Sequence, residues 1–248
     1  MQFMDTHIHL QDFKLKNATD IVNKAVSCGV RKLVCVAAAE ADWAEIAALS
    51  AEFPDTVIPA FGLHPWYARE AGAGWELRLA AYLEHFPQAL IGEAGLDRLR
   101  DKEAEPQGAV FRAQIELAAQ YGRPLLIHAV RAQEWLEDYW RVLPPKFVFH
   151  SFNGRRELLD KILKVGGYVS LSSSILRSPR KAEIVPQIPA DRLLLETDAP
   201  SQGLVSGQEG TPEQLPAQAA EIATLRGEDA ASFAARVYQN SMEFVYVG

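Results

Sequence analysis

His7 and His9 are separated by one residue at the end of a short apolar run near the start of the chain. Because alternate side chains of a β-strand project from the same face, we expect the two imidazoles to converge on one point. A His-X-His pair can also be an ordinary pair of solvated or hydrogen-bonded histidines. The pair is informative only if other metal-ligating side chains arrive at the same place.

Four later apolar segments also end on a metal-ligating side chain, namely Ala89–Glu93, Pro124–His128, Phe147–His150 and Leu193–Asp198. The combined set has four imidazoles and two carboxylates: His7, His9, Glu93, His128, His150 and Asp198. This set exceeds the four ligands of one tetrahedral metal ion. It suits two divalent ions, about 3.5–4 Å apart, that share a bridging carboxylate and a bridging hydroxide. Such a site stays net positive and would attract a phosphate oxygen.

The elements that must position these residues alternate along the chain. Apolar runs of strand length are followed by segments with helical periodicity, which indicates repeated βα units and a parallel sheet. We count eight units, with strands at Gln2–His7, Lys32–Ala37, Thr56–Phe61, Ala89–Glu93, Pro124–His128, Lys146–His150, Tyr168–Leu171 and Arg192–Glu196. The sequence therefore predicts an α/β fold, a single (β/α)8 TIM barrel over residues 1–248. Active sites of this fold lie at the carboxyl ends of the strands, where the candidate ligands fall.

Local signals predict where several helices begin and end. Thr19 is expected to cap a helix that stops at Gly29, Pro106 to lie in a first helical turn, and Gly122 and Gly166 to end helices. The polar loop Ser201–Gln214 is expected to cover the site, followed by two closing helices at Pro216–Leu225 and Glu228–Val245.

Composition restricts the classes of function. The chain has 48% hydrophobic and 23% charged residues, which is typical of a globular protein. Its net charge of −7 argues against a broad basic surface, so nucleic acid would need a local site. No run is apolar enough to span a membrane and the start lacks a secretory signal, so we expect a cytoplasmic protein. Cys28 and Cys35 are interpreted as packing residues.

In order and spacing, six motifs of this chain resemble those of the TatD-type metal-dependent hydrolases and deoxyribonucleases of the amidohydrolase superfamily. They are Asp5–Leu10, Gly62–Pro65, Gly92–Asp97, Pro124–His128, His150–Gly154 and Leu194–Pro200. The resemblance covers nearly the whole chain and implies a TIM barrel. It implies that His7, His9 and Asp198 ligate one metal, that His128 and His150 ligate the other, and that Glu93 bridges them. Family members characterised as nucleases cleave DNA, typically with Mg²⁺ or Mn²⁺. Two histidines with a carboxylate also suit Zn²⁺.

The chain departs from the family pattern around the substrate. After the fifth-strand histidine many members carry Arg and then an acidic residue, whereas Val130 and Arg131 stand here. An Arg-Asn-Glu-Pro element is usual after the eighth strand, but this chain has Gly210–Leu215. Arg98 replaces a common tyrosine after Asp97. The metal ligands are therefore complete while the substrate contacts are altered.

Three catalytic roles are predicted. Asp198 is expected to act as general acid/base, Glu93 to bridge the metals, and His64 to contact a non-bridging phosphate oxygen, although His64 can equally be a loop histidine fixed before Pro65. Other candidates each have a structural alternative. Trp66 and Tyr67 could stack on a base or pack over the barrel mouth. Arg98, Arg100 and Arg131 could bind phosphate or form surface ion pairs. Asp5 and Asp97 could orient ligand histidines or a phosphate-binding arginine, Asp97 could cap a loop, and His85 is interpreted as a surface residue.

Three functions remain open from the sequence. The first is a divalent-metal-dependent deoxyribonuclease of the 3'-5' exonuclease type, acting on single strands or strand ends, because a barrel mouth suits a strand terminus better than a duplex. The second is a small-molecule phosphoesterase, lactonase or amidohydrolase that uses the same binuclear site. The third is a non-catalytic interaction protein. Sequence alone leaves a monomer and a weak homo-oligomer open.

Overall fold

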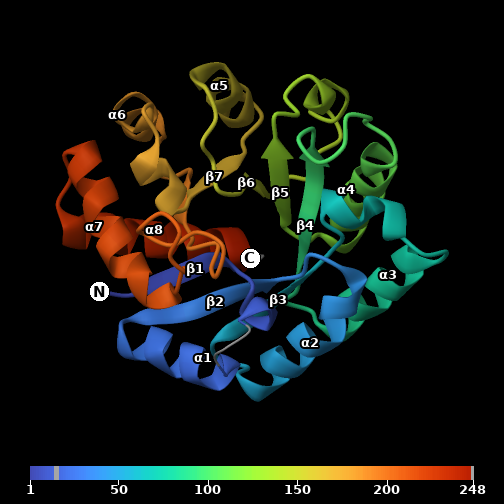
Figure 1. Cartoon of the computed structure of the whole chain (residues 1–248), viewed down its shortest axis with the longest axis horizontal. Helices are drawn as coiled ribbons and strands as arrows, with labels where there is room; N and C mark the ends of the chain where they lie inside the picture. Colours follow the sequence, from blue (N-terminus) through green and yellow to red (C-terminus); the bar gives the residue numbers. More distant parts are fainter. Residues whose placement is uncertain (14–16, 247–248) are drawn as a thin grey trace.

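Parallel strands follow one another around the molecule in chain order, and each pairs with the next (Figure 1). The computed structural model describes residues 1–13 and 17–246. Within these ranges the eight strands are β1 (Phe3–Ile8), β2 (Val30–Val36), β3 (Val57–Phe61), β4 (Leu90–Asp97), β5 (Leu125–Val130), β6 (Phe147–Phe149), β7 (Tyr168–Leu171) and β8 (Leu193–Leu195). All eight predicted strands are present. β4 runs four residues past Glu93, which places Asp97 at a strand end.

The sheet closes because the segment after β8 returns to the side of β1. Ile8 and Ala199 form a parallel bridge. The His9 N–H donates to the Ala199 carbonyl at 2.8 Å, and the Thr6 hydroxyl donates to the Leu195 carbonyl at 2.9 Å. These bonds complete a nearly closed barrel, which confirms the predicted (β/α)8 fold.

Helices alternate with the strands and surround the barrel (Figure 1). The α-helices are α1 (Ala18–Ser27), α2 (Trp43–Glu52), α3 (Trp75–His85), α4 (Gln107–Tyr121), α5 (Arg156–Lys164), α6 (Lys181–Ile184), α7 (Leu215–Arg226) and α8 (Ala230–Val245). Short 3₁₀ helices are η1 (Leu10–Asp12), η2 (Glu40–Asp42), η3 (Pro65–Glu70), η4 (Trp135–Asp138), η5 (Ser173–Arg177), η6 (Val185–Gln187) and η7 (Pro212–Gln214). The two predicted closing helices are confirmed as α7 and α8. No helix in the described ranges has both the length and the apolar character needed to cross a membrane.

The fifth connection differs from the expected βα unit. Between β5 and β6 the described chain forms the 3₁₀ helix η4 and no α-helix. Pro144 and Pro145 stand just before β6 and cannot donate the backbone hydrogen bonds of a helix interior, so the helix-forming part of this segment is short. The barrel therefore has a thinner wall on this side.

Helix ends mostly follow the predicted signals, with one error. Asn17 caps α1, because its side-chain oxygen accepts a hydrogen bond from the Thr19 N–H at 3.0 Å. The prediction that Thr19 is the cap is wrong, since the Thr19 hydroxyl instead donates to Glu52 at 3.1 Å. Pro106 is the residue immediately before α4 and does not lie inside its first turn. Gly122 ends α4 in a left-handed conformation with φ 63°, as predicted.

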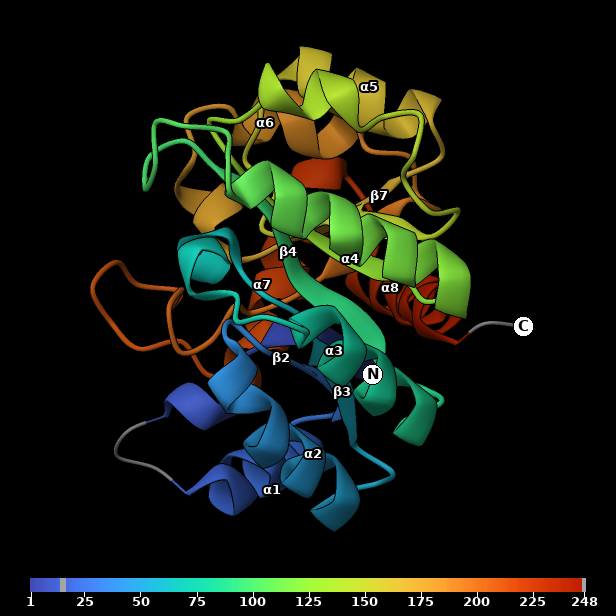
Figure 2. The same cartoon turned by 90° about the vertical axis from the view of Figure 1, so that its right-hand side faces the viewer.

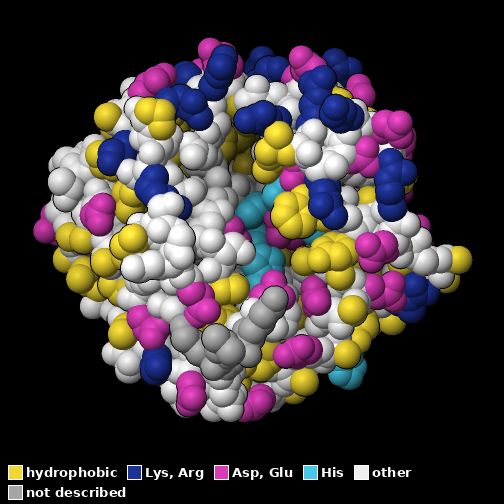
Figure 3. All heavy atoms as spheres, viewed as in Figure 1, with side chains coloured by type: hydrophobic (Ala, Val, Ile, Leu, Met, Phe, Trp, Pro, Cys, Tyr) yellow, Lys and Arg dark blue, Asp and Glu magenta, His cyan; other side chains and the backbone are white. Residues whose placement is uncertain are grey.

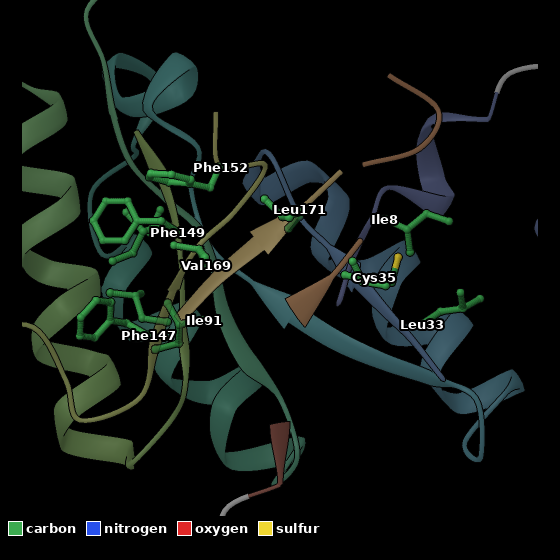
Figure 4. Close-up of a cluster of buried hydrophobic side chains, with 14 of the residues drawn as sticks. Ile8, Leu33, Cys35, Ile91, Phe147, Phe149, Phe152, Val169 and Leu171 are labelled. Carbon is green, nitrogen blue, oxygen red and sulfur yellow. The ribbon is translucent and has the colours of Figure 1, made fainter. Parts of the chain in front are cut away.

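Two layers of apolar side chains hold the barrel together. Inside it, Met4, Val34 and Leu194 pack with Phe244 of α8, which plugs one end. Outside it, strand side chains pack against the helices, and Figure 4 shows part of that layer. Cys35 is buried there, which confirms its predicted packing role, but Cys28 is exposed just after α1, so the same prediction for Cys28 is wrong.

The two ends of the barrel have different roles. Figure 2 shows α8 at one end and the loop between β8 and α7 at the other. Because α8 fills the end where the strands begin, the open end is the one where the strands finish. Side chains that follow the strands are thus gathered around a single mouth.

Candidate metal centre

Four histidines line one hollow at the carboxyl ends of the strands, where Figure 3 shows cyan side chains, and the fully buried His7 lies against them. The cavity has a volume of about 310 Å³. Its wall includes His9, His64, Glu93, His128, His150 and Asp198. Residues from β1, β3, β4, β5, β6 and β8 therefore meet here, as the strand-end pattern predicted.

The buried carboxylate of Glu93 lies at the centre of this cluster. Its Oε1 atom is 2.7 Å from His128 Nδ1 and 2.8 Å from His150 Nε2. Its Oε2 atom is 3.4 Å from His7 Nε2 and 3.6 Å from His9 Nε2. The two oxygens thus face two different pairs of imidazole nitrogens, which is the arrangement expected of a bridging carboxylate.

Asp198 completes the group on the Oε2 side. Its Oδ1 atom is 3.5 Å from His9 Nε2 and 3.9 Å from His7 Nε2, and the two imidazole nitrogens are 3.3 Å apart. One donor atom from each of these three buried residues lies within 4.8 Å of the others. This spacing fits three ligands around one cation.

The second nitrogen of each imidazole indicates whether the first is free to bind a metal. His9 Nδ1 is 2.8 Å from the Val36 carbonyl, so Nδ1 carries the proton and Nε2 keeps its lone pair. His150 Nδ1 is 3.4 Å from Glu196 Oε1, and His128 Nε2 is 3.3 Å from Asp97 Oδ2. These three rings therefore present an unprotonated nitrogen toward Glu93 when they are neutral.

His64 has the opposite arrangement. Its Nδ1 atom accepts a hydrogen bond from the Trp66 N–H at 3.0 Å, so the proton of the neutral ring is on Nε2. That Nε2 atom is 3.4 Å from Glu93 Oε1 and 3.2 Å from His128 Nδ1. Burial lowers the pKa of His64, which keeps the ring neutral. His64 is therefore suited to donate a hydrogen bond, although its position beside Glu93 and His128 would also allow a ligand.

The carboxylates of the centre stay ionised. Burial alone would raise the pKa of Glu93, but the charge of His150 and hydrogen bonds from His128 and His150 hold it well below its usual value. For His9, burial acts to lower the pKa, yet the hydrogen bond to Asp198 and the charge of Glu93 raise it to about 9. Negative charge on the carboxylates is what attracts protons to this ring, and it would attract a metal cation in the same way.

Residues 4–245 match the model of the TatD related DNase family. This chain belongs to the TatD family. An exonuclease from Erwinia tasmaniensis, named 3'-5' ssDNA/RNA exonuclease TatD, is 30% identical over 91% of this chain and 92% of its own length. A metal-dependent hydrolase of Haemophilus influenzae is 27% identical over 98% of this chain and 99% of its own. The crystal structure of YjjV, a TatD homologue from Escherichia coli, superposes with a TM-score of 0.90 at 28% identity and covers 99% of this chain and 98% of that one. The chain is thus a TatD-family metal-dependent hydrolase with a TIM-barrel fold.

Two glycines of this TatD chain bring Glu93 beside the fifth strand. A Cβ atom on Gly95 would lie 2.0 Å from the His128 carbonyl oxygen, and one on Gly92 would lie 2.7 Å from Leu126 Cβ. Both have positive φ, 145° and 155°, which side chains disfavour. The Gly92–Asp97 motif therefore needs its glycines so that β4 can approach β5 closely.

Asp198 is placed by the closure of the barrel. Its N–H donates to the His7 carbonyl at 2.9 Å, and its φ is 53°. Asp5, which was predicted to orient a histidine ring or an arginine, instead accepts from the Thr197 N–H at 2.9 Å and from the Thr197 hydroxyl at 2.5 Å. Asp5 therefore fixes the segment that carries Asp198. Asp5 also accepts from the His7 backbone N–H at 3.3 Å, so it contacts a candidate ligand residue through the main chain and not through the ring.

Asp97 satisfies both of its predicted roles. Its Oδ2 atom faces His128 Nε2 and also accepts from the Trp66 indole N–H at 2.7 Å. Its Oδ1 atom accepts from the N–H groups of Leu99 at 2.8 Å and Arg100 at 3.2 Å, which caps the following loop. A single carboxylate thus links a ligand ring, an aromatic side chain of the mouth and the β4–α4 loop.

The remaining candidates are distributed around the mouth. Trp66 is 51% exposed and lines the cavity with Tyr67. Arg100 lies over the Trp66 ring, whereas Arg98 pairs with Glu134 at 2.8 Å. Exposed Arg131 also lines a cavity at the mouth, one that neighbours the central hollow. His85 is exposed at the end of α3, which confirms its surface interpretation.

Sequence reasoning missed two residues of this centre. Glu196 is fully buried, lies behind His150, and accepts from the Ser151 N–H at 2.6 Å. Gln202 donates to Asp198 Oδ2 at 2.5 Å from the loop after β8. Glu196 had a usable signal, because it is a charged residue that ends a predicted apolar strand. Gln202 had none, since a polar residue in a polar loop is ordinary.

Proposed function

We propose that this protein, a single domain over residues 1–248, is a divalent-metal-dependent 3'-5' exonuclease acting on single strands or strand ends of DNA. The observation that carries the proposal is that the two oxygens of Glu93 face separate donor sets. The relative from E. tasmaniensis, named as an exonuclease on single-stranded DNA and RNA, supports the substrate class.

The donor atoms fit two divalent ions. His7, His9, Asp198 and Glu93 Oε2 would hold one ion, and His128, His150 and Glu93 Oε1 would hold the other. The fit rests on the ring nitrogens that face Glu93 while their second nitrogens contact acceptors. When bound, such ions polarise a phosphate and lower the pKa of water to near neutrality. The mixed nitrogen and oxygen donors suit Mn²⁺ or Zn²⁺, whereas Mg²⁺ would depend more on the carboxylates.

Two side chains would handle protons and charge during hydrolysis. Asp198, whose carboxylate borders the cavity, accepts the proton of the attacking water and passes it toward the leaving oxygen. His64 donates from its Nε2–H to a non-bridging phosphate oxygen, for which its proton position is suitable. Glu93 contacts both sets of donor atoms and so fixes their positions relative to each other. Water attacks phosphorus, the P–O bond to the leaving nucleotide breaks, and that oxygen receives the proton.

The test is cleavage of 5'-labelled single-stranded and double-stranded DNA by the purified chain with Mg²⁺, Mn²⁺ or Zn²⁺. We expect stepwise shortening of single strands from the 3' end, its loss in EDTA, and its loss in Glu93→Ala. Glu116→Ala is the matched control, because Glu116 is exposed on α4. The proposal is wrong if both variants shorten DNA alike, or if the metal-loaded wild-type protein leaves every strand intact.

A small-molecule phosphoesterase, lactonase or amidohydrolase is the second candidate. It is favoured by the missing positive charge at Gly210–Leu215 and by Val130, where many relatives of this family carry Arg. Intact DNA together with metal-dependent cleavage of a small ester, lactone or amide would select this candidate.

A further inference from the structure

A second cavity opens beside the metal centre. Its volume is about 700 Å³, and it shares a wall with the central cavity through Ala129, Val130, His150 and Ser151. Its lining comes from the segments after β4, β5, β6 and β7, so it lies at the same end of the barrel as the metal ligands. In Figure 3, Lys and Arg side chains gather above the central hollow, toward the side where Figure 1 places α5.

The charge of this cavity is opposite to that of the whole chain. Its lining contains four arginines and one carboxylate, namely Arg98, Arg131, Arg155, Arg180 and Glu134. Glu134 is already paired with Arg98 at 2.8 Å. The other three guanidinium groups leave a local positive charge in a protein of net charge −7. We call this feature the arginine cavity.

Three of these arginines have unused hydrogen-bond donors. Arg131 and Arg155 are exposed, and their side chains have no ion pair or hydrogen bond to any described residue. Arg180 donates from Nη2 to the Asn153 carbonyl at 2.9 Å, but its buried Nε has no partner. Guanidinium groups without partners are suited to phosphate oxygens, which accept two parallel hydrogen bonds from one arginine.

The rest of the lining is partly apolar. Phe149, Phe152 and Leu158 contribute to it, but they are only 2%, 4% and 7% exposed, and Figure 4 draws both phenylalanines within a buried cluster. The cavity lies between the residue that leads into η4 and those that begin α5, since Glu134, Arg155 and Leu158 line it. The exposed groups of the lining are therefore mainly guanidinium groups, which suit the phosphates of a strand.

We propose that the arginine cavity binds the strand next to its cleaved end. The phosphates that flank the penultimate nucleotide contact Arg131, Arg155 and Arg180. The inference rests on the proposed exonuclease function and adds the path of the strand. These arginines also replace, from other loops, the positive charge that the chain lacks at Gly210–Leu215.

The sizes and charges of the cavities favour a strand path through the arginine cavity over a path through the cavity on the other side of the metal centre. The central cavity of about 310 Å³ has room for the scissile phosphate and one terminal unit, so the strand must continue across the rim. A cavity on the other side shares only Ser201 with the centre. Its one arginine, Arg177, already donates to the Gly203 carbonyl at 2.7 Å, and Glu209 also lines it.

The test compares two double variants that remove the same charge. Arg131→Ala/Arg155→Ala alters the cavity. Arg141→Ala/Arg156→Ala is the control, because these exposed arginines do not line the cavity and Arg156 pairs with Asp160 at 2.7 Å. Binding of 5'-fluorescein-labelled hexathymidylate is measured by anisotropy in EDTA at several salt concentrations. Turnover of bis(4-nitrophenyl) phosphate with Mn²⁺ shows whether the metal centre is intact.

We expect the cavity variant to bind hexathymidylate roughly tenfold more weakly than the wild type, with a salt dependence reduced by about 0.7 in log–log slope for each lost contact. The control variant should bind as the wild type does, and all three proteins should hydrolyse the small diester equally.

The outcomes separate this inference from the proposed function. Equal affinities of the two double variants, or no binding by the wild type, overturn the arginine cavity as a strand site. If the strand binds through these arginines but is not shortened by the metal-loaded protein, the cavity assignment stands and the exonuclease proposal is wrong.

Discussion

The two sides of the Glu93 carboxylate differ in what holds their imidazoles in place. On the Oε2 side, His9 donates to a backbone carbonyl, that of Val36, and His7 Nδ1 makes no hydrogen bond to a described residue, as is also true of His150 Nδ1 on the other side. On the Oε1 side, a carboxylate lies behind each ring: Asp97 behind His128 and Glu196 behind His150. One side is thus supported mainly by the main chain and the other by buried acids.

This difference indicates two distinct ways of building a cation site. A carboxylate behind an imidazole fixes its proton and makes the facing nitrogen more basic. The Oε1 side therefore obtains negative charge indirectly, through its rings. The Oε2 side obtains it directly, because Asp198 itself faces His7 and His9. A substitution on one side of Glu93 should accordingly lower the affinity for the ion on that side more than the affinity for the other ion.

The largest expected effects come from removing one imidazole on each side. His9→Ala should lose the ion on the Oε2 side and His128→Ala the ion on the Oε1 side, so metal content falls from about two ions per chain to about one. Each variant should lose at least about a hundredfold in turnover, because both cations stabilise the charge of the transition state. Elemental analysis of the purified proteins, with activity, measures both.

His85→Ala is the control for these variants, since His85 is exposed at the end of α3. The comparison between the two sides breaks down if either substitution removes all bound metal. That result would mean that the five histidines and two carboxylates form one indivisible site.

The ligands on both sides of Glu93 could be predicted from the sequence, because their positions depend on strand periodicity. His7, His9, His128 and His150 lie near or just after the carboxyl ends of their strands, and Glu93 lies within β4, so strand periodicity and parallel topology were enough to bring them together. The resemblance of their motifs to those of the TatD family indicated the family and the division of the metal ligands into two sets.

Support for the rings was harder to predict because it depends on three-dimensional packing. Glu196 follows β8 and faces His150, which follows β6, across the intervening strand β7, and sequence spacing does not reveal that contact. Arg155 and Arg180 reach one cavity from separate loops. A similar local competition decided the cap of α1, where the Asn17 side chain bonds the Thr19 N–H while the Thr19 hydroxyl binds Glu52.

A smaller effect should follow when the acid behind a ring is neutralised. Glu196→Gln keeps the shape of a buried side chain but removes the charge behind His150, so metal affinity on the Oε1 side should fall about 10–100-fold. Asp97→Asn should act in the same direction through His128. Competition of bound Mn²⁺ or Zn²⁺ against a chelator measures the affinity of each ion, with Glu116→Gln as the control.

Weakening of the Oε2-side ion by Glu196→Gln, with the other ion unchanged, would contradict the assignment of Glu196 to His150. Thermal unfolding of the metal-free variant shows whether the fully buried side chain has disturbed the fold instead. A wild-type melting temperature with reduced affinity is the result we expect.

The smallest expected effect concerns the group that holds Asp198. Gln202 Nε2 donates to Asp198 Oδ2 at 2.5 Å and to the Ser151 hydroxyl at 2.9 Å. Gln202→Ala removes one hydrogen bond to a carboxylate that remains fixed by its backbone N–H to His7. Because such a bond contributes about 1 kcal/mol, kcat should fall roughly fivefold while metal content stays at the wild-type level. Gln208→Ala, an exposed change in the same loop, should leave kcat unaltered. A loss of metal in Gln202→Ala would instead show that Gln202 supports Asp198 as a ligand, which would make the Oε2 side dependent on a side-chain partner in the same way as the Oε1 side.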